Sequence, residues 1–297
     1  MSGELAFDAW MRSVQAEMES ALEEFLPQAT ETSARLCDAM RYAVLDGGKR
    51  VRPLLVFAAG ALFDAQPESL ARAAAAVEMI HAYSLVHDDM PCMDDDELRR
   101  GKPTVHVKYG EAGALLAGDA LQTQAFLVLA QTAGDAKRII AMVQLLAEAS
   151  GAAGMCGGQA IDLESVGLPL SLDQLERMHR LKTGALLRAS VLLGAMSGKM
   201  LSSTEQEALD DYAKAIGLAF QVVDDILDAT ADSATLGKTA GKDAADNKPT
   251  YVSILGLEQS RALAEKLRGD AHAAVAPFGG KGRRLREIAD LIVQRKA

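Results

Sequence analysis

Aspartate residues gather at two places in the 297-residue chain. The segment HDDMPCMDDDELRRGKP, residues 87–103, has five Asp and one Glu within ten positions, followed closely by two arginines and a lysine. An isolated acidic run is most often a solvated surface loop. The second segment, QVVDDILDAT, contains Asp224 and Asp228, which share one face of a helix and repel each other by about 0.2–0.5 kcal/mol. Solubility alone does not explain this pair, so the two segments together predict a site.

A ligand set of carboxylate oxygens, without His or Cys as ligands, suits a hard cation, above all Mg²⁺. Mg²⁺ usually takes one or two protein carboxylates and completes its coordination with water and substrate phosphate. Asp88 and Asp89 end one predicted helix, which Pro91 stops, and Asp224 lies near the end of another. Side chains from two helix ends can converge, so we expect two or three Mg²⁺ ions to hold a diphosphate between the clusters. Mn²⁺ could serve at the same ligands.

Fixed cations near both clusters fit this interpretation. Arginine grips phosphate oxygens with two parallel hydrogen bonds, whereas lysine acts as a point charge. The net charge of the chain is −10, so an anion must be bound through local cations or bound metal, and a nucleic-acid partner is not expected. The basic side chains concerned are Lys49, Arg50, Arg52, Arg99, Arg100, Lys182 (followed by Thr183), Lys238 and Lys242.

Two ExxH sequences, Glu78–His81 and Glu176–His179, suggest a different metal site, because ferritin-like di-iron proteins use this spacing. That fold also needs a bridging Glu from each of two further helices, and candidates such as Glu148 are not distinctive. Di-iron chemistry would leave both aspartate clusters and the basic segments without a role. We therefore favour the magnesium interpretation.

Composition and patterning indicate a soluble, cytoplasmic protein. Hydrophobic residues make up 49% of the chain, enough for a substantial core. Cys37, Cys92 and Cys156 are widely spaced without a zinc pattern, which suits a reducing compartment, and Cys92 is interpreted as a spacer. The N-terminal segment lacks the basic start and apolar core of a signal peptide. The longest apolar run, 11 residues from Pro53, is too short to cross a bilayer, so no membrane insertion is expected.

Apolar residues recur at three- and four-residue steps along nearly the whole chain, which predicts one all-α domain over residues 1–297. Thr204 and Glu207 have capping-box spacing and predict the start of one helix. Residues 103–110 alternate like a strand but have no partner, and residues 230–248 read as a long loop. Helices are expected at 4–26, 31–46, 53–64, 67–91, 111–132, 135–150, 152–164, 171–195, 202–229, 257–276 and 281–295.

The order of the motifs resembles the trans-prenyltransferase (polyprenyl diphosphate synthase) family, most closely its bacterial farnesyl diphosphate synthases. The similarity runs from GGKRVRP through HDDMPCMDDDELRRGKPTVH, LAGDAL, GGQAIDL, KTG and FQVVDDILD to the closing QRKA. The resemblance implies a helical bundle around a deep central cavity, usually as a homodimer, with both aspartate motifs at the cavity mouth. It also implies an enzyme that joins isopentenyl diphosphate to dimethylallyl and then geranyl diphosphate, giving farnesyl diphosphate.

The resemblance assigns roles position by position. Mg²⁺ would be bound by Asp88, Asp94 and Asp224, with Asp89 and Asp228 as further ligands or as support. The diphosphate of isopentenyl diphosphate would be bound by Lys49, Arg52, His81 and Arg100. The allylic diphosphate would be bound by Arg99, Lys182 and Lys238, with Thr183 and Gln221 close to the reacting carbons. Lys242, Lys248 and Arg295 either close over this site or are ordinary surface charges.

The chemistry agrees with these roles. Cleavage of the allylic C–O bond leaves positive charge on carbon and negative charge on the departing diphosphate, which metal ions and fixed cations stabilise. An apolar cavity protects the carbocation from water. The double bond of isopentenyl diphosphate attacks, and by family analogy the released diphosphate takes the proton. His81 lies seven residues before Asp88, about two helical turns, so the two share a helix face.

Tyr83 and Ser84 lie five and four residues before Asp88, about 6–7.5 Å deeper along a helix. A growing isoprenoid tail would meet the wall there. In the family, bulk at these positions helps to stop elongation, and Tyr followed by Ser, with the DDxxxxD spacing, resembles the bacterial farnesyl type. A geranylgeranyl diphosphate synthase is the alternative, since it shares almost every other motif.

Two other functions are compatible with the same fold. A terpene cyclase would replace the second motif with a mixed Asn, Ser and Glu arrangement and would not need Lys49, Arg52 and Arg100, whereas DDILD is intact here. A non-catalytic regulatory subunit would have lost Asp or Arg residues at the cavity mouth, and none is missing. We therefore expect an active prenyltransferase.

Overall fold

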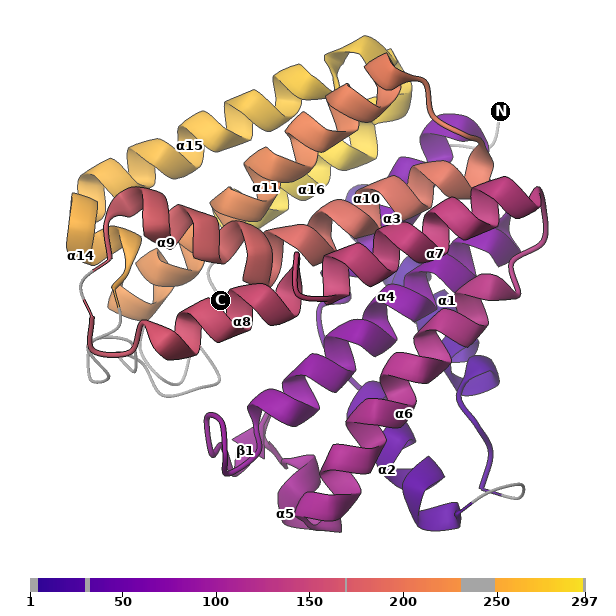
Figure 1. Ribbon diagram of the computed structural model, residues 1–297. Coiled ribbons are helices and arrows are strands. Elements are labelled where there is room, and N and C mark those ends of the chain that lie inside the picture. The colour runs from indigo at the N-terminus through magenta and orange to yellow at the C-terminus, as the bar shows by residue number, and fades with distance from the viewer. Residues whose placement is uncertain (1–4, 30–32, 169, 231–248, 296–297) are drawn as a thin grey trace.

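The computed structural model describes residues 5–29, 33–168, 170–230 and 249–295, and helices make up nearly all of their regular structure (Figure 1). The strands in these ranges, β1 (Leu98–Arg99) and β2 (Lys102–Pro103), form one short antiparallel hairpin. The expected all-α fold is confirmed. The α-helices are α1 (Phe7–Phe25), α2 (Ala34–Val44), α3 (Val51–Gly60), α4 (Pro67–Asp88), α5 (Val105–Tyr109), α6 (Glu111–Ala130), α7 (Ala136–Ser150), α8 (Met155–Glu164), α9 (Leu172–His179), α10 (Ala185–Gly198), α11 (Ser203–Thr230), α14 (Tyr251–Leu255), α15 (Leu257–Ala274) and α16 (Arg283–Gln294).

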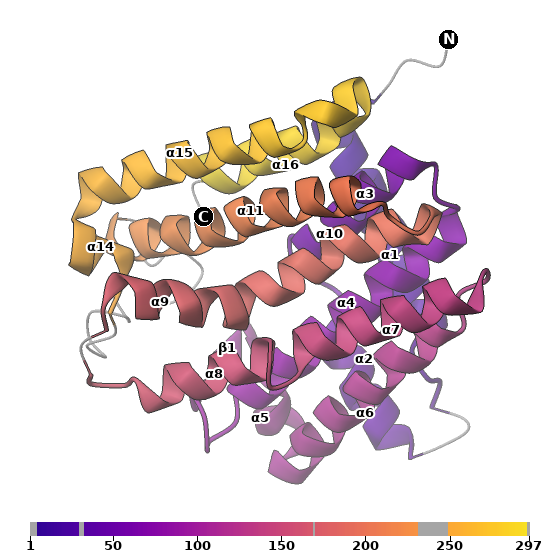
Figure 2. The same cartoon turned by 45° about the horizontal axis from the view of Figure 1, so that its top comes forward.

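Helix α4 runs through the bundle and packs against α3, α6 and α10 (Figure 1). Beyond α10, helix α11 packs against α15 and α16, which form an outer layer (Figure 2). The C-terminal ends of α4 and α11 lie on the same side of the bundle, together with α8, α9 and the end of the chain (Figure 1). This topology places both aspartate segments at one end of the molecule.

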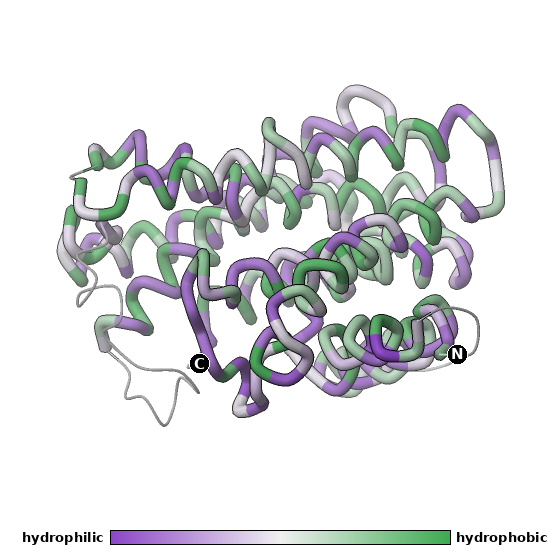
Figure 3. Tube along the Cα trace, turned by 60° about the horizontal axis from the view of Figure 1, so that its bottom comes forward, coloured by the Kyte–Doolittle hydropathy of each residue, from purple (hydrophilic) through white to green (hydrophobic). Residues whose placement is uncertain are grey.

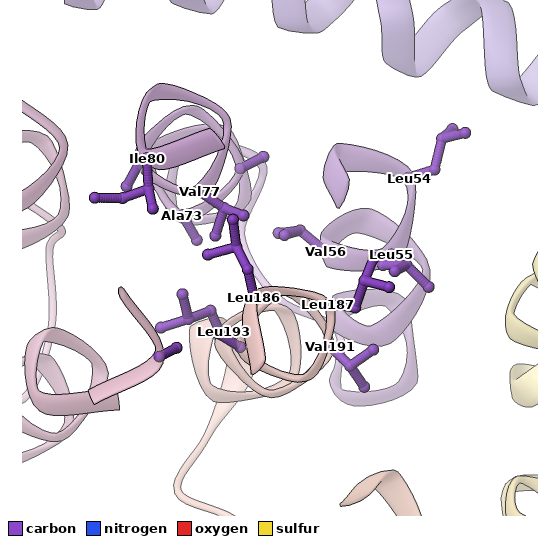
Figure 4. Close-up of a cluster of buried hydrophobic side chains, with 14 of the residues drawn as sticks. Leu54, Leu55, Val56, Ala73, Val77, Ile80, Leu186, Leu187, Val191 and Leu193 are labelled. Atoms are coloured by element: carbon purple, nitrogen blue, oxygen red, sulfur yellow. The ribbon is translucent and has the colours of Figure 1, made fainter. Parts of the chain in front are cut away.

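The centre of the core lies where α3, α4 and α10 meet. Four consecutive alanines of α4, residues 73–76, are fully buried and leave room for larger aliphatic side chains of the neighbouring helices. Hydrophobic and hydrophilic residues alternate along most helices (Figure 3), as in helices that bury one face. The side chains gathered at the centre include Leu55, Val56, Ala73, Val77, Ile80, Leu186, Leu187, Val191 and Leu193 (Figure 4).

The predicted cap of α11 is wrong by two residues. Ser202 and Glu205 cap the helix, and not Thr204 and Glu207: Glu205 N donates to Ser202 Oγ at 3.3 Å, and Ser202 N donates to Glu205 Oε2 at 2.9 Å. Both pairs have the same spacing. The first pair is used because it lies directly after the turn that ends α10.

Residues 103–110 alternate like a strand in sequence but are mostly helical. The helix is α5, in which Val105 and Tyr109 are buried. These two residues are four apart, so the brief alternation hid the spacing of one helical face.

Other boundaries differ in smaller ways. The helix expected from Pro53 begins at Val51, ends at Gly60 and continues as a 3₁₀ turn, Ala61–Phe63. The helix expected over 171–195 is divided into α9, a π-helical turn at Arg180–Gly184, and α10. A second 3₁₀ turn, Ala276–Gly282, precedes α16. The predicted loop at 230–248 lies, apart from Thr230, outside the described residues.

Two described segments, Glu111–Ala130 and Ala136–Glu164, are long and apolar enough to cross a membrane by length and composition. The search of the sequence for uninterrupted apolar runs did not detect them, because polar residues interrupt both segments. Core helices of soluble proteins pass the same test. The second segment is not one continuous helix, since α7 ends at Ser150 and α8 begins at Met155.

Arg50 anchors the loop between α2 and α3. It is 4% exposed and has a left-handed φ of 52°, a backbone conformation that disfavours most side chains. Its guanidinium donates to Glu78 Oε1 at 2.7 Å, to Glu19 Oε1 at 2.5 Å and to the Val44 carbonyl at 2.7 Å. The Glu of the first ExxH sequence therefore serves this ion pair, and the pairing fixes the loop that carries Lys49.

Glu78→Ala should strongly destabilise the protein, because it leaves the buried Arg50 charge without its closest buried partner. We expect a loss of about 3 kcal/mol in the free energy of unfolding, measured by urea denaturation. The control is Glu68→Ala, which removes an exposed i,i+4 pair with Arg72 and should cost less than about 0.5 kcal/mol. Equal losses in both variants would show that Arg50–Glu78 is not a structural anchor.

Candidate active site

The first aspartate segment begins at the C-terminal end of α4. Asp88 is the last residue of the helix, and the chain then folds back so that Asp94 N donates to the Asp88 carbonyl at 2.9 Å. The loop therefore returns Asp94 to the helix end that carries Asp88, as the DDxxxxD spacing requires. Cys92 lies exposed in this loop.

Asp89 and Arg99 form a close ion pair. Arg99 Nε lies 2.9 Å from Asp89 Oδ1 and 2.8 Å from Oδ2, and Arg99 Nη2 also contacts Oδ1. Asp89 is buried at 2% exposure, so its charge needs this partner. The pair joins the loop end at β1 to the end of α4. Two predicted site residues thus contact each other, and Asp89 holds Arg99 in place.

The four residues predicted to bind isopentenyl diphosphate line one cavity of about 530 Å³, on the α3 and α4 side of the site. Gly48 has φ 92°, and an added Cβ there would lie 2.9 Å from the Arg100 guanidinium, so glycine lets the loop pack against Arg100. Burial lowers the pKa of His81 well below 6.5, and the neighbouring Arg52 and Arg100 lower it further. His81 is therefore neutral at pH 7. The predicted residues lining the cavity are Lys49, Arg52, His81 and Arg100.

The second aspartate segment occupies the last two turns of α11, and its three carboxylates have different surroundings. Asp224 accepts a hydrogen bond from Arg295 Nη2 at 2.6 Å, so Arg295 lies at the site and is not a remote surface charge. Asp225 Oδ2 accepts from Tyr251 N at 2.7 Å and so holds the start of α14. Asp228 is 7% exposed, and its Oδ1 has no hydrogen-bond partner among the described residues.

The π-helical turn between α9 and α10 carries Lys182 and Thr183. Such turns are rare and often mark functional sites. Gly158 of α8 lets the turn approach, because a Cβ there would lie 2.1 Å from the Lys182 backbone nitrogen. Lys182 Nζ donates to Asp162 Oδ2 at 2.6 Å. Asp162, in GGQAIDL, was not among the predicted site residues. Its position one helical turn after Gly158 could have indicated that it faces the same neighbouring segment as Gly158.

A second cavity, of about 160 Å³, lies between α8, α9 and α11. Gln221 lies in it and is paired with His179, whose Nδ1 is 3.0 Å from the Gln221 Nε2 amide nitrogen. His179 belongs to the second ExxH sequence, so a residue of each ExxH sequence is bound to a protein partner: Glu78 to Arg50 and His179 to Gln221. The residues that line the cavity include Asp162, His179, Lys182, Gln221, Asp224 and Asp225.

Lys182 links the two aspartate segments. Burial raises the pKa of Asp88 to about 6; the positive charge of Lys182 opposes this rise, and Asp94 adds to it. Lys182 also lines the cavity that contains Asp224. On the opposite side, burial lowers the pKa of Lys49, Arg295 lowers it further, and Asp224 raises it. The negative charge of Asp224 therefore affects Lys49 in the first cavity, although Asp224 itself lines the second. Asp88 and Asp94 line neither cavity, and their link to Asp224 runs through Lys182.

The residues present fit Mg²⁺ bound together with a substrate. The available donors are carboxylates, the ligands that Mg²⁺ prefers. Among the described residues no three His, Cys, Asp or Glu side chains gather closely enough to hold a metal ion by themselves. The buried Asp228 Oδ1 atom has no hydrogen-bond partner among the described residues, and the pKa of Asp88 stays raised although Lys182 and Arg99 lower it, so a bound ion would stabilise both carboxylates. A site that needs substrate phosphate to complete its coordination has these properties.

Tyr83 is 5% exposed and faces α8: its hydroxyl lies 3.5 Å from Cys156 Sγ, and its ring meets His87 edge to face. Ser84 Oγ donates to the His81 carbonyl and so stays within its own helix. Cys156, which is exposed, contacts Tyr83 and was not among the residues predicted from the sequence. Lys238, Lys242 and Lys248 lie outside the described residues.

Asp88→Asn should stabilise the metal-free protein at pH 7.5. Because the pKa of Asp88 is raised in the folded state, its ionised form costs folding energy above pH 6. Removing that charge should add about 2 kcal/mol to the free energy of unfolding, allowing for partial solvent access. The gain should shrink as the pH falls from 6 toward 3.8, and the exposed Asp95→Asn control should show none. A gain that is independent of pH would contradict a buried, ionised Asp88.

Comparison with known proteins places this site in a family. The polyprenyl synthetase family model matches residues 33–276. The chain is 51% identical over 290 residues to a probable farnesyl diphosphate synthase of Bradyrhizobium diazoefficiens, covering 97% of this chain and 87% of that one. It is also 51% identical over 282 residues to the farnesyl diphosphate synthase of Escherichia coli, covering 93% and 94%.

Solved structures agree. The crystal structure of an FPP/GFPP synthase from Zymomonas mobilis has a TM-score of 0.88 and 43% identity, covering 97% of this chain and 98% of that one. The family is all-α, uses isoprenoid diphosphate substrates and is generally Mg²⁺-dependent. The chain belongs to the polyprenyl synthetase family and is a prenyltransferase.

Proposed function

We propose that the protein condenses isopentenyl diphosphate head to tail with dimethylallyl and then geranyl diphosphate, giving farnesyl diphosphate and diphosphate. The observation that carries this proposal is a pair of cavities that are linked electrostatically, since Asp224 of one raises the pKa of Lys49 in the other. One is lined by Lys49, Arg52, His81 and Arg100, the other by Lys182, Gln221 and Asp224. The first cavity is lined by fixed cations and the second by aspartates with one lysine, which suits one diphosphate bound by cations and a second bound together with metal ions.

The allylic substrate fits the cavity with Lys182. There the lysine offsets negative charge that develops on the departing diphosphate. Bound Mg²⁺, two or three ions held by Asp88, Asp94 and Asp224, supplies further positive charge at the same oxygens, and Mn²⁺ could serve instead. Asp89 keeps Arg99 beside this group, and Asp228 offers a buried oxygen for support. Thr183, in the π turn, and Gln221 would face the carbon on which positive charge appears; Lys238 is proposed as a further diphosphate ligand.

Isopentenyl diphosphate fits the first cavity. Lys49, Arg52 and Arg100 supply its positive charge, and neutral His81 can donate a hydrogen bond to a phosphate oxygen without adding charge. The double bond then attacks the allylic carbon, and one proton is lost to the released diphosphate. Arg295, which contacts Asp224 of the second cavity, is proposed to close over the bound substrates.

Asp94→Asn should reduce kcat by at least about 100-fold, because it removes a carboxylate that holds Mg²⁺ at the departing diphosphate. The matched control is Asp95→Asn, one residue further on. Asp95 is exposed with φ 50°, a conformation that Asn tolerates well, so this variant should stay within about threefold of wild type. The assay uses isopentenyl and geranyl diphosphates with Mg²⁺, and with EDTA as a second control. Activity that survives EDTA, or equal losses in both variants, would refute the metal assignment.

Product length is proposed to depend on Tyr83, with Ser84 beside it. Tyr83→Ala should open the cavity wall and give products longer than fifteen carbons, as sized by chromatography of the radiolabelled prenols. Tyr83→Phe keeps the ring and loses only the hydroxyl next to Cys156, so it should keep the fifteen-carbon product. An unchanged product from Tyr83→Ala would exclude Tyr83 as the stop.

The same assay separates the alternatives. A twenty-carbon main product from the wild-type chain would indicate a geranylgeranyl diphosphate synthase. A regulatory subunit would give no turnover with Mg²⁺ and any allylic primer. The intact carboxylates and arginines described above favour the enzyme.

We further propose that the whole chain is one domain, since the buried apolar residues form one cluster, and that it works as a soluble cytoplasmic homodimer. Helix α6 is apolar around most of its surface, yet Leu116 and Leu127 are 56% and 49% exposed, and Ile140 of α7 is 58% exposed. A helix of this composition is normally covered on all sides, and a second copy would cover it.

Light scattering should therefore give twice the mass of the 31.4 kDa chain. The double variant Leu116→Glu/Leu127→Glu should shift the protein to monomer while its helix content stays unchanged. A wild-type monomer at micromolar concentration would contradict the proposed dimer.

A further inference from the structure

We propose that His179 is a positioning residue that fixes the side-chain amide of Gln221 at the reacting end of the allylic substrate. The inference rests on the proposed function, because Gln221 lies beside reacting atoms only if the allylic substrate binds in the second cavity. It gives a role to the second ExxH sequence, which neither the metal ligands nor the diphosphate-binding residues use. Its basis is a chain of contacts from Gln221 through His179 to the start of α14.

The central contact joins α9 to α11. His179, the last residue of α9, is 9% exposed, and its Nδ1 lies 3.0 Å from Gln221 Nε2. An amide nitrogen only donates, so the imidazole nitrogen must accept. Gln221 precedes Asp224 by three residues and therefore shares its helix face. The amide nitrogen is thus turned toward His179, and the carbonyl oxygen, Oε1, makes no hydrogen bond with another described residue.

The imidazole is held so that it can accept. Burial lowers the pKa of His179 to about 4, although the nearby Asp162 raises it, so the ring is neutral at pH 7. Its other nitrogen, Nε2, is buried without a hydrogen-bond partner among the described residues. The ring stacks on Tyr251, with centroids 5.8 Å apart and planes inclined by 27°. Asp225 in turn binds the Tyr251 backbone nitrogen, so the second aspartate segment itself fixes this wall.

The orientation of the amide matters because its two ends have opposite polarity. An amide oxygen beside a carbon that becomes positive stabilises the developing charge, whereas an amide NH₂ group there destabilises it. Gln221 can rotate between these states unless one end is bound. The nitrogen bound to His179 leaves the oxygen for the cavity that also contains Lys182 and Asp224. Loss of such positioning can cost about 100-fold in rate.

Two substitutions separate this role from simple packing. His179→Phe keeps the ring and its stacking on Tyr251 but has no acceptor. His179→Asn loses the stacking ring but places an amide oxygen near the position of Nδ1. If His179 positions Gln221, Phe should lower kcat about 10- to 100-fold with KM for both substrates within about threefold, and Asn should recover at least tenfold relative to Phe. If His179 only fills space, the order reverses: Phe keeps activity, and Asn loses it. That order overturns the proposal.

A second readout does not depend on turnover. In ¹⁵N-histidine NMR of the substrate-free wild-type protein at pH 7, His179 should be a neutral imidazole protonated on Nε2. Gln221→Leu should shift the Nδ1 resonance, because it removes the bonded amide, whereas the surface variant Gln206→Leu should not. A cationic His179, or an Nδ1 resonance unchanged by Gln221→Leu, overturns the pairing even in an active enzyme. Wild-type protein without prenyltransferase activity but with the expected NMR pattern would instead locate the failure in the proposed function, and His179 would then have no catalytic group to position.

Discussion

Carboxylates held apart from water and close to one another are costly unless positive charge balances them, and this constraint governs the functional end of the molecule. The protein supplies part of the balance itself. Arg99 neutralises Asp89, Lys182 lies between Asp88 and the second cavity, and Arg295 contacts Asp224. The balance is incomplete at Asp88, whose pKa is raised by burial, and at Asp228, whose buried Oδ1 has no hydrogen-bond partner in the described part of the chain. In the proposed function, cations bound together with a diphosphate would supply the missing positive charge.

The fold keeps these charges in place through rigid local features. Arg50 bonds the loop between α2 and α3 to Glu19 of α1 and Glu78 of α4. The π turn that carries Lys182 packs closely against Gly158 of α8. Asp225 is buried within an aspartate motif, and its Oδ2 accepts a hydrogen bond from the Tyr251 backbone nitrogen. Each of these contacts costs conformational strain or desolvation energy, and each holds a segment that carries a cavity-lining residue. The packed core of α3, α4 and α10 provides folding free energy that offsets these costs.

Sequence reasoning recovered what depends on periodicity and on charge. Helical spacing predicted most elements, and several of the basic residues near the aspartate segments line the two cavities. Sequence reasoning failed where two pairs of residues had the same spacing, as at Ser202 and Thr204, and it left the short helix α5 unassigned because its residues alternate. It also missed contacts between distant segments, such as Lys182 with Asp162 and Gln221 with His179. No periodicity encodes which buried polar groups meet across helices, because that depends on tertiary packing.

The central claim is that the two aspartate segments act on one diphosphate. Calorimetric titration of Mg²⁺ and inorganic diphosphate into wild type, Asp94→Asn, Asp224→Asn and the double variant tests it most directly. If both carboxylates serve the same ion cluster, each single variant should weaken Mg²⁺-dependent binding by more than about tenfold, and the double variant should lose little more than either alone. Losses that simply add would mean two independent metal sites and would contradict the account.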